Sequence, residues 1–576
     1  MRSRFIIVAA VVLSTACRQA AAPAASTASH TGEPVITLAL VNGRIWTGDP
    51  ARKSAEAIAI AGERIAAVGT SAEIRAKAGT AETVDLAGAF VTPGFIDSHV
   101  HFLDGGFRLA SVQLRDASTR DEFVARIKAF AATVPAGSWI TGGDWDHTLW
   151  GGDLPRRDWI DAVTPNHPVW INRLDGHMAL ANSAALRAAG VPEDVKDVEG
   201  GEIVRDGKGR PTGVLKDNAM TLVEGRMPPA SDAMNDRALD AAMQYVAAQG
   251  VTAVHHMGTW EQLAVFERAW RAHRLSTRIQ AAVPLSTWER LRDAVAAKRF
   301  GPDGLGDVWL KVGTLKAFVD GSLGSHTAAF HEPFSDSAAS AKATARQGTD
   351  RGLFVTPPGD LYAAISGADK AGLHVAVHAI GDRANTTILD IFERVARENG
   401  PRDRRFRIEH AQHLRPSDIP RFAPLGVIAS MQPYHAIDDG RWAENVIGPV
   451  RSRTTYAFRS LLDAGATLAF GSDWYVAPPT PLEGIYAAVT RRTLDDKHPD
   501  GWVPEQKISV EEALTAYTRG GALASFSEGD TGAITPGLLA DITVIDRDLR
   551  TIPAPEIRAA KIVRTIVGGR TVYRRD

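Results

Sequence analysis

Two histidines one residue apart, His99 and His101, end a short apolar run at residues 93–101. If this run is a β-strand, residues i and i+2 point to the same face, so both imidazoles can bind one metal ion. The spacing alone is weak evidence. With 17 histidines among 576 residues, the expected number of such pairs by chance is roughly one half. Metal-competent residues elsewhere in the chain must therefore support it.

Such residues follow several later apolar runs. Lys316, His378, His410 and Asp473 each lie in or directly after a short β-rich run, and helical patterns separate several of these runs. Polar residues at the C-terminal ends of successive strands are typical of the active site of a (β/α)8 TIM barrel, an α/β fold. A single histidine of this kind is more often a hydrogen-bonded core residue, but the whole set indicates a metal centre.

The residues around these positions form longer motifs, which are Thr92-Pro93-Gly94-Phe95-Ile96-Asp97-Ser98-His99-Val100-His101, Asp320-Gly321-Ser322-Leu323-Gly324-Ser325, His378-Ala379-Ile380-Gly381-Asp382-Arg383-Ala384, Ile408-Glu409-His410-Ala411-Gln412 and Gly471-Ser472-Asp473-Trp474. These motifs resemble the amidohydrolase superfamily. Within it they are similar to the amidohydrolase-3 branch of N-substituted formamide deformylase-like and predicted exoenzyme-regulatory proteins, and the resemblance covers about residues 36–575.

The resemblance implies a centre of two metal ions. By the family pattern, His99 and His101 bind the more buried ion and Asp473 contacts it. His378 and His410 bind the second ion, and a carboxylated lysine bridges the two. In this sequence Lys316 matches the bridging position.

The ligand types define the chemistry that this centre could perform. Two divalent ions held by imidazole and carboxylate can share a water and lower its pKa toward about 7. Lys316 could bridge them only if burial lowers its pKa, so that the free amine adds CO₂ and becomes an anionic carbamate. Lys311 is the rival bridging residue. Asp473 is the expected general base, and imidazole ligands favour zinc, with manganese, iron and cobalt as alternatives.

Three functions compete. The leading hypothesis is hydrolysis of a non-peptide amide, formamide or N-acyl bond in a small-molecule amide substrate. The second is deamination, or ester or lactone cleavage, although residues after His378 lack the His-x-x-Glu of mononuclear deaminases. The third is a non-catalytic envelope protein that binds a ligand or metal. The complete ligand set favours an enzyme.

The N-terminus predicts export. Residues 1–17 combine a basic start, an apolar stretch too short to span a bilayer, and small residues before Cys17. This resembles a bacterial lipobox, in which Cys17 would carry a lipid anchor to the membrane, and the alternative is ordinary cleavage in the Ala-rich stretch that follows. Either way we expect a periplasmic or membrane-anchored protein, with residues 18–34 as a flexible tether. Cys17 is the only cysteine, so no intrachain disulfide can form.

Composition and pattern also predict the domains. A net charge of −2 and the lack of any Lys/Arg-dense run give no sign of a nucleic-acid partner, and no motif sets an oligomeric state.

The barrel is expected at residues 93–522. An insert is expected at about residues 105–232, because the next plausible strand, at 251–256, lies too far away for an ordinary loop. Short β-patterned runs at 35–92 and 523–576 are expected to pair into one β-sandwich.

The predicted insert is rich in tryptophan, with Trp139, Trp145, Trp150, Trp159 and Trp170. These side chains could form the insert's own core, or some could line a pocket over the barrel mouth. The predicted substrate contacts are Trp145, Arg173, His177 and, after the seventh strand, His435.

Overall fold

The computed structural model describes residues 34–336 and 349–576. The predicted signal peptide with Cys17, and all but the last residue of the predicted tether, lie outside these ranges. Residues Ile36–Asp576 form one compact unit. Within the described ranges, no helix has the length and apolar character needed to cross a bilayer.

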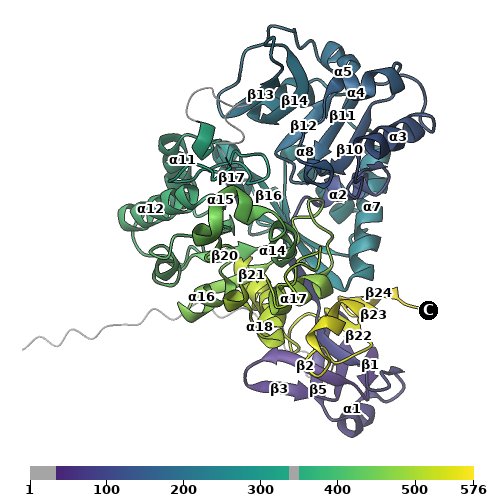
Figure 1. The fold of residues 1–576 in the computed structure, drawn as a ribbon. Coiled ribbons are helices and arrows are strands. Elements are labelled where there is room, and N and C mark those ends of the chain that lie inside the picture. Colours follow the sequence, from purple (N-terminus) through teal and green to yellow (C-terminus); the bar gives the residue numbers. More distant parts are fainter. Residues whose placement is uncertain (1–33, 337–348) are drawn as a thin grey trace, which may run out of the picture. The chain divides into compact units, whose positions relative to one another are not determined.

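Eight parallel strands form the barrel, and their order in the sheet follows their order in the chain. They are β8 (Phe95–Val100), β15 (Val251–Met257), β16 (Arg278–Pro284), β17 (Leu310–Phe318), β18 (His374–Ala379), β19 (Arg407–His410), β20 (Ile428–Met431) and β21 (Thr467–Phe470). Four of them, β16, β17, β20 and β21, are labelled in the centre of Figure 1. The backbone N–H of Asp473, just beyond β21, donates to the carbonyl of His99 at 2.7 Å. This contact joins the last strand to the first, and the predicted α/β barrel is confirmed.

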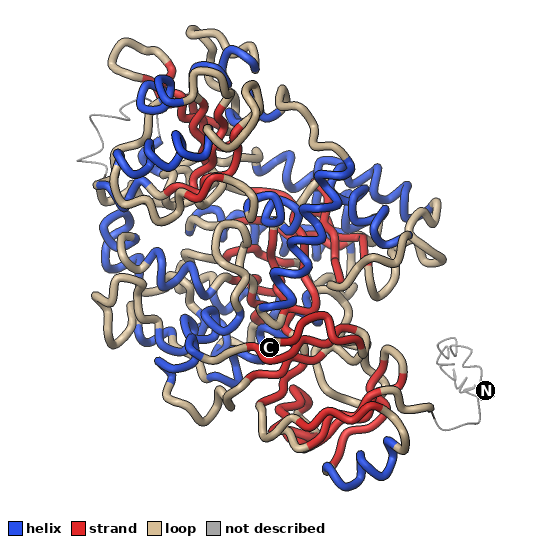
Figure 2. The backbone as a smooth tube through the Cα atoms, turned by 90° about the vertical axis from the view of Figure 1, so that its right-hand side faces the viewer, coloured by secondary structure: helices blue, strands red, loops and turns tan. Residues whose placement is uncertain are grey.

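Helices follow the strands and run along the outside of the barrel (Figure 2). The main ones are α7 (Asp232–Ala248), α8 (Trp260–Arg271), α9 (Trp288–Ala296), α11 (Pro358–Lys370), α12 (Asp382–Asn399), α16 (Phe458–Asp463), α17 (Pro481–Thr490) and α18 (Val510–Thr515). The side chain of Ser231 caps α7 by accepting from the amide of Met234, and Gly250 with φ 80° follows its end.

Between β8 and β15 the chain builds a separate six-stranded sheet. Its strands are β9 (Val112–Gln113), β10 (Ile140–Trp145), β11 (Val169–Arg173), β12 (Met178–Ala181), β13 (Gly201–Arg205) and β14 (Pro211–Asp217), flanked by α3 (Arg120–Ala131) and α5 (Ser183–Ala188). All five tryptophans of this segment pack in its two apolar clusters. The structure therefore supports the interpretation that they form the insert's own core.

Strands from both ends of the chain form two further sheets. The four-stranded sheet has the order β5-β4-β1-β6 and the six-stranded sheet β24-β23-β22-β7-β2-β3. Their strands are β1 (Leu38–Val41), β2 (Arg44–Asp49), β3 (Arg52–Ala55), β4 (Ala57–Ala61), β5 (Arg64–Gly69), β6 (Glu82–Asp85), β7 (Phe90–Pro93), β22 (Ile542–Ile545), β23 (Ile562–Val567) and β24 (Arg570–Arg574). β7 pairs with the C-terminal β22, and one apolar core contains Leu40, Val91 and Ile542. The predicted sheet pairing of the two ends is confirmed.

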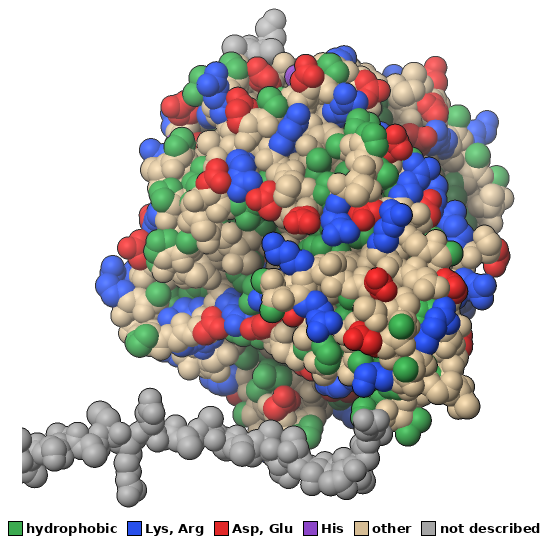
Figure 3. Space-filling view, turned by 90° about the horizontal axis from the view of Figure 1, so that it is seen from below, with side chains coloured by type: hydrophobic (Ala, Val, Ile, Leu, Met, Phe, Trp, Pro, Cys, Tyr) green, Lys and Arg blue, Asp and Glu red, His purple; other side chains and the backbone are tan. Residues whose placement is uncertain are grey.

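Charged side chains of both signs are interspersed on the face shown in Figure 3. This distribution agrees with the nearly balanced composition of 65 Lys and Arg against 67 Asp and Glu.

Candidate metal centre

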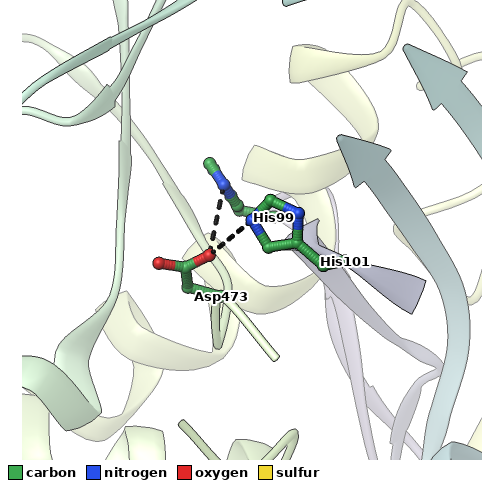
Figure 4. Close-up of side chains that lie close together, drawn as sticks. All are labelled: His99, His101 and Asp473. Atoms are coloured by element: carbon green, nitrogen blue, oxygen red, sulfur yellow. Dashed lines mark ion pairs between the residues drawn. The ribbon is translucent and has the colours of Figure 1, made fainter. Parts of the chain in front are cut away.

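His99, His101 and Asp473 meet at the C-terminal end of the barrel strands. Oδ1 of Asp473 lies 3.4 Å from Nε2 of His99 and 3.2 Å from Nε2 of His101 (Figure 4). Although this oxygen is buried, it has no hydrogen-bond partner among the described residues. A buried carboxylate oxygen that faces imidazole nitrogens without a hydrogen bond is a fitting ligand for a cation.

Unusual backbone conformations occur at two of the ligand positions. His410 has φ 74° and Asp473 has φ 60°, a region that residues other than glycine rarely adopt. Such conformations persist where the surrounding structure imposes them, which is common at functional sites. Gly471 allows the close approach, because a Cβ there would lie 2.6 Å from the amide nitrogen of His99.

His378 and His410 form the opposite side of the centre. Their ring centroids lie 4.5 Å apart, and the ring of His410 lies 5.0 Å from that of His99. Nε2 of His378 lies 3.1 Å from the carbonyl of Gly321, and Nδ1 of His410 lies 2.8 Å from Oε1 of Gln432. Each ring thus has one nitrogen fixed by an acceptor, which leaves the other nitrogen available as a ligand.

Lys316, and not Lys311, reaches this centre. Its Nζ lies 3.3 Å from Nε2 of His99, and burial lowers the pKa of the Lys316 ammonium to about 8. Lys311 lies near the start of β17, where its Nζ donates to the carbonyls of Ser525 and Phe526 at 2.8 Å each. The geometry therefore removes Lys311 as the rival bridging residue.

A buried carboxylate contacts Nδ1 of His99 and is itself paired with a buried arginine. Oε2 of Glu409 lies 2.6 Å from Nδ1 of His99, and Oε1 lies 2.8 Å from Nε of Arg407; both side chains of this ion pair are 0% exposed. Burial alone would raise the pKa of the Glu409 carboxyl, but Arg407 and His99 outweigh it, so this pKa lies well below its usual range. A carboxylate at Nδ1 fixes the tautomer in which Nε2 of His99 faces a metal.

Two further buried carboxyl groups that sequence reasoning missed hold the loops of the site. Asp97 accepts hydrogen bonds from the amide and hydroxyl of Ser472 at 2.8 and 2.6 Å, next to Asp473. Asp320 accepts from the amides of Ile380 and Gly381 at 3.0 and 2.8 Å, just after His378. Both lie inside the motifs that carry the family resemblance. This position was the only feature of the sequence that could have marked them as site residues.

The insert supplies part of the wall above these residues. Nδ1 of His177 lies 2.6 Å from Oδ1 of Asp217, and its ring centroid lies 5.0 Å from that of His378. Arg173 lines the same pocket, but its guanidinium pairs with Asp175 at 2.8 Å and Asp146 at 3.4 Å. Its charge is thus already balanced within the protein.

The structure does not bring Trp145 to this pocket. Its side chain is fully buried in the insert core, where Nε1 donates to the carbonyl of Ile171 at 2.9 Å. The prediction of Trp145 as a substrate contact is therefore wrong. His435 does line the pocket, and so does the half-buried Trp442, which sequence reasoning missed.

Comparison with known proteins agrees with this geometry. The sequence profile of the amidohydrolase family matches residues 82–573. The chain belongs to the amidohydrolase family. Protein LONG AFTER FAR-RED 3 of Arabidopsis thaliana is 40% identical over 552 residues, or 94% of this amidohydrolase and 92% of that protein. N-substituted formamide deformylase of Arthrobacter pascens is 29% identical over 558 residues, or 93% and 98% of the two chains.

A solved structure of similar fold comes from Pyrococcus horikoshii. The crystal structure of an uncharacterized metal-dependent hydrolase from this organism superposes on the amidohydrolase with a TM-score of 0.72 and 28% identity, covering 90% of this chain and 99% of that one. With the family match and the cluster of metal-competent residues, this similarity makes the protein a hydrolase of the metal-dependent amidohydrolase superfamily.

The donor set of the amidohydrolase fits divalent metal ions. Three side chains can offer ligand atoms to one ion in each of two groups. The groups are His99–His101–Asp473 and His410–His435–Asp473, and within each group the ligand atoms lie within 4.8 Å of one another. The groups share Asp473. Neutral imidazole is the form that binds a metal. Burial, assisted by Lys316, lowers the pKa of His99 to about 4, which keeps this ring neutral at pH 7.

Proposed function

We propose that the protein hydrolyses a C–N bond other than a peptide bond, in an amide, formamide or N-acyl group of a small molecule. The main support is Asp473, whose carboxylate belongs to two groups of imidazoles at the barrel mouth and whose Oδ1 has no hydrogen-bond partner among the described residues. The similarity to N-substituted formamide deformylase, over 93% of this chain, favours the same bond type.

Two divalent ions would be held by His99, His101, His378, His410 and Asp473. The imidazole donors favour zinc. Such ions, when bound, supply a water of lowered pKa and polarise the substrate carbonyl. Asp473 would accept the proton of the attacking water on a carboxylate oxygen and return it to the departing nitrogen. Burial raises the pKa of the Asp473 carboxyl, but His99 and His101 outweigh it, so the pKa is well below its usual value and the base is ionised at neutral pH.

Lys316 would act in the carboxylated form. With a pKa near 8, a fraction of its side chain is the free amine at neutral pH. This amine can add to CO₂ and release one proton, giving a carbamate whose single negative charge is shared by two oxygens. The ammonium form of Lys316 would repel the metal ions, whereas the carbamate would attract them.

A hydrolysis screen tests this function. The metal-loaded protein is incubated with formamides, N-acyl amino acids and cyclic amides, and separately with lactones, esters and aminopyrimidines, and products are identified by mass spectrometry. We expect cleavage in the first group, with no turnover by a chelated sample. Turnover confined to the second group would establish the esterase or deaminase alternative, and ligand binding without turnover would indicate a binding protein.

We also propose that the chain is exported and anchored through a lipid on Cys17. The support is the sequence of residues 1–17. Labelled palmitate should enter the wild-type protein in a bacterial host and be absent from a Cys17→Ser variant. Release of an unlabelled wild-type protein into the periplasm would instead establish ordinary cleavage.

A further inference from the structure

The helix after β20 places one more imidazole at the metal centre than the family pattern requires. His435 lies in α14 (Pro433–Asp439), which begins directly after Gln432. Its ring is parallel to that of His410 within 11°, with the centroids 6.4 Å apart. One ring nitrogen of each lies within 4.8 Å of the other and of a carboxylate oxygen of Asp473.

The hydrogen bonding of this ring is incomplete. Nε2 of His435 is shielded from solvent and has no hydrogen-bond partner among the described residues. Oδ1 of Asp473 is also buried and has no hydrogen-bond partner among the described residues. Buried polar atoms without partners are rare in folded proteins, because each costs the free energy of its lost hydration. Two of them in one cluster are explained together if a cation lies between them.

We propose that His435 is a protein ligand of the ion at His410 and Asp473. The second ion would then have donors from β19, from the end of β21 and from α14, and His378 would complete its coordination or face the substrate. Tetrahedral or five-coordinate ions accept such sets of imidazole and carboxylate. The assignment rests on the proposed metal-dependent function but concerns metal binding itself, so it is tested without substrate.

Titration of metal-free protein with Co²⁺ is the direct test. The wild-type protein should bind two ions, and His435→Ala should keep the first affinity while the second weakens at least about tenfold, with an altered visible Co²⁺ spectrum. His435→Asp, which restores a ligand atom, should recover part of the second affinity. His331→Ala is the matched control, because His331 is half-buried and its Nε2 faces Thr386, away from the centre.

Unchanged affinities for both ions in His435→Ala would overturn the proposal. In case that variant does not fold, a crystal of the Zn²⁺-loaded wild-type protein gives an independent answer. Anomalous density should place an ion about 2.0–2.1 Å from a ring nitrogen of His435. An ion bound by His378 and His410 without contact to His435 would also overturn it. If His435 binds metal and no C–N substrate is cleaved, only the proposed function fails.

Discussion

Replacing Glu409 by Gln should weaken metal binding and stability by separate routes. The substitution keeps the size of the side chain and removes the charge that faces both Nδ1 of His99 and the guanidinium of Arg407. Loss of a carboxylate behind a metal-binding imidazole typically costs about 10- to 100-fold in metal affinity. We therefore expect the ion at His99 and His101 to bind more weakly by this factor.

The effect on stability follows from burial. Surface ion pairs contribute only about 0–1 kcal/mol, but Arg407 and Glu409 are both 0% exposed. Removing one partner of a buried pair leaves an uncompensated charge and costs about 3–5 kcal/mol. The free energy of unfolding of the metal-free Glu409→Gln protein should fall by that amount in urea titrations with chelator present.

A second substitution separates the two effects. Arg407→Met in the Glu409→Gln background removes the stranded guanidinium, so a large part of the lost stability should return. Metal affinity should stay low, because His99 still lacks its carboxylate. The reasoning is refuted if Glu409→Gln binds metal as tightly as the parent, or if the double variant regains metal affinity together with stability.

Three other predictions concern the same centre. Chelation should remove two ions per chain, and elemental analysis that finds one at saturation would point to a mononuclear site. Asp473→Asn should lose less metal than a His99→Ala, His101→Ala double change, because the amide oxygen remains a weak ligand, and should lose about 10²–10⁴ in kcat, measured with metal content on the same preparation; a protein that keeps both ions and turns over at the parent rate would assign the base elsewhere. The Lys316 pKa, lowered from 10.5 to about 8 by burial, means that the unfolded chain binds more protons than the folded one between these pH values. Stability of the metal-free protein should therefore rise with pH from about 8 to 10.5 as the cost of the buried ammonium disappears, on the order of 3 kcal/mol, and Lys316→Met should abolish this rise in unfolding experiments.

Local patterns were sufficient to predict the residues at the ends of the barrel strands. Strand alternation predicted His99 and His101 on one side, and in the structure His99 lies in β8 and His101 directly follows its last residue. The short apolar runs before His378 and Asp473 mark where strands end. The pairing of the chain ends followed from the same kind of pattern. These features depend on a few neighbouring residues and on strand periodicity.

The role of Glu409 could not be predicted in this way, because its partner His99 lies 310 residues away in the chain. The sequence also left open whether the tryptophans of the insert form its core or line a pocket, and Trp145 was predicted as a substrate contact. Apolar periodicity identifies the buried face of an element and gives no information on whether that face meets a core or a cavity. His435 was predicted as a substrate contact from its place after the seventh strand, and that place alone does not indicate which groups its ring nitrogens face.

The origin of each group explains why the sequence indicates the chemistry of this protein better than its substrate. Most of the metal-competent side chains lie on or just after barrel strands, which is where TIM barrels carry their active sites whatever the substrate. The walls above them come from other segments. Asp217 in β14 orients His177, the loop after β11 contributes Asp175, and Trp442 follows α14. Substitutions of Asp175, Asp217 or Trp442 should alter substrate preference while affinity for the ion at His99 and His101 stays constant, because none of these three side chains touches the nitrogens of His99 or His101.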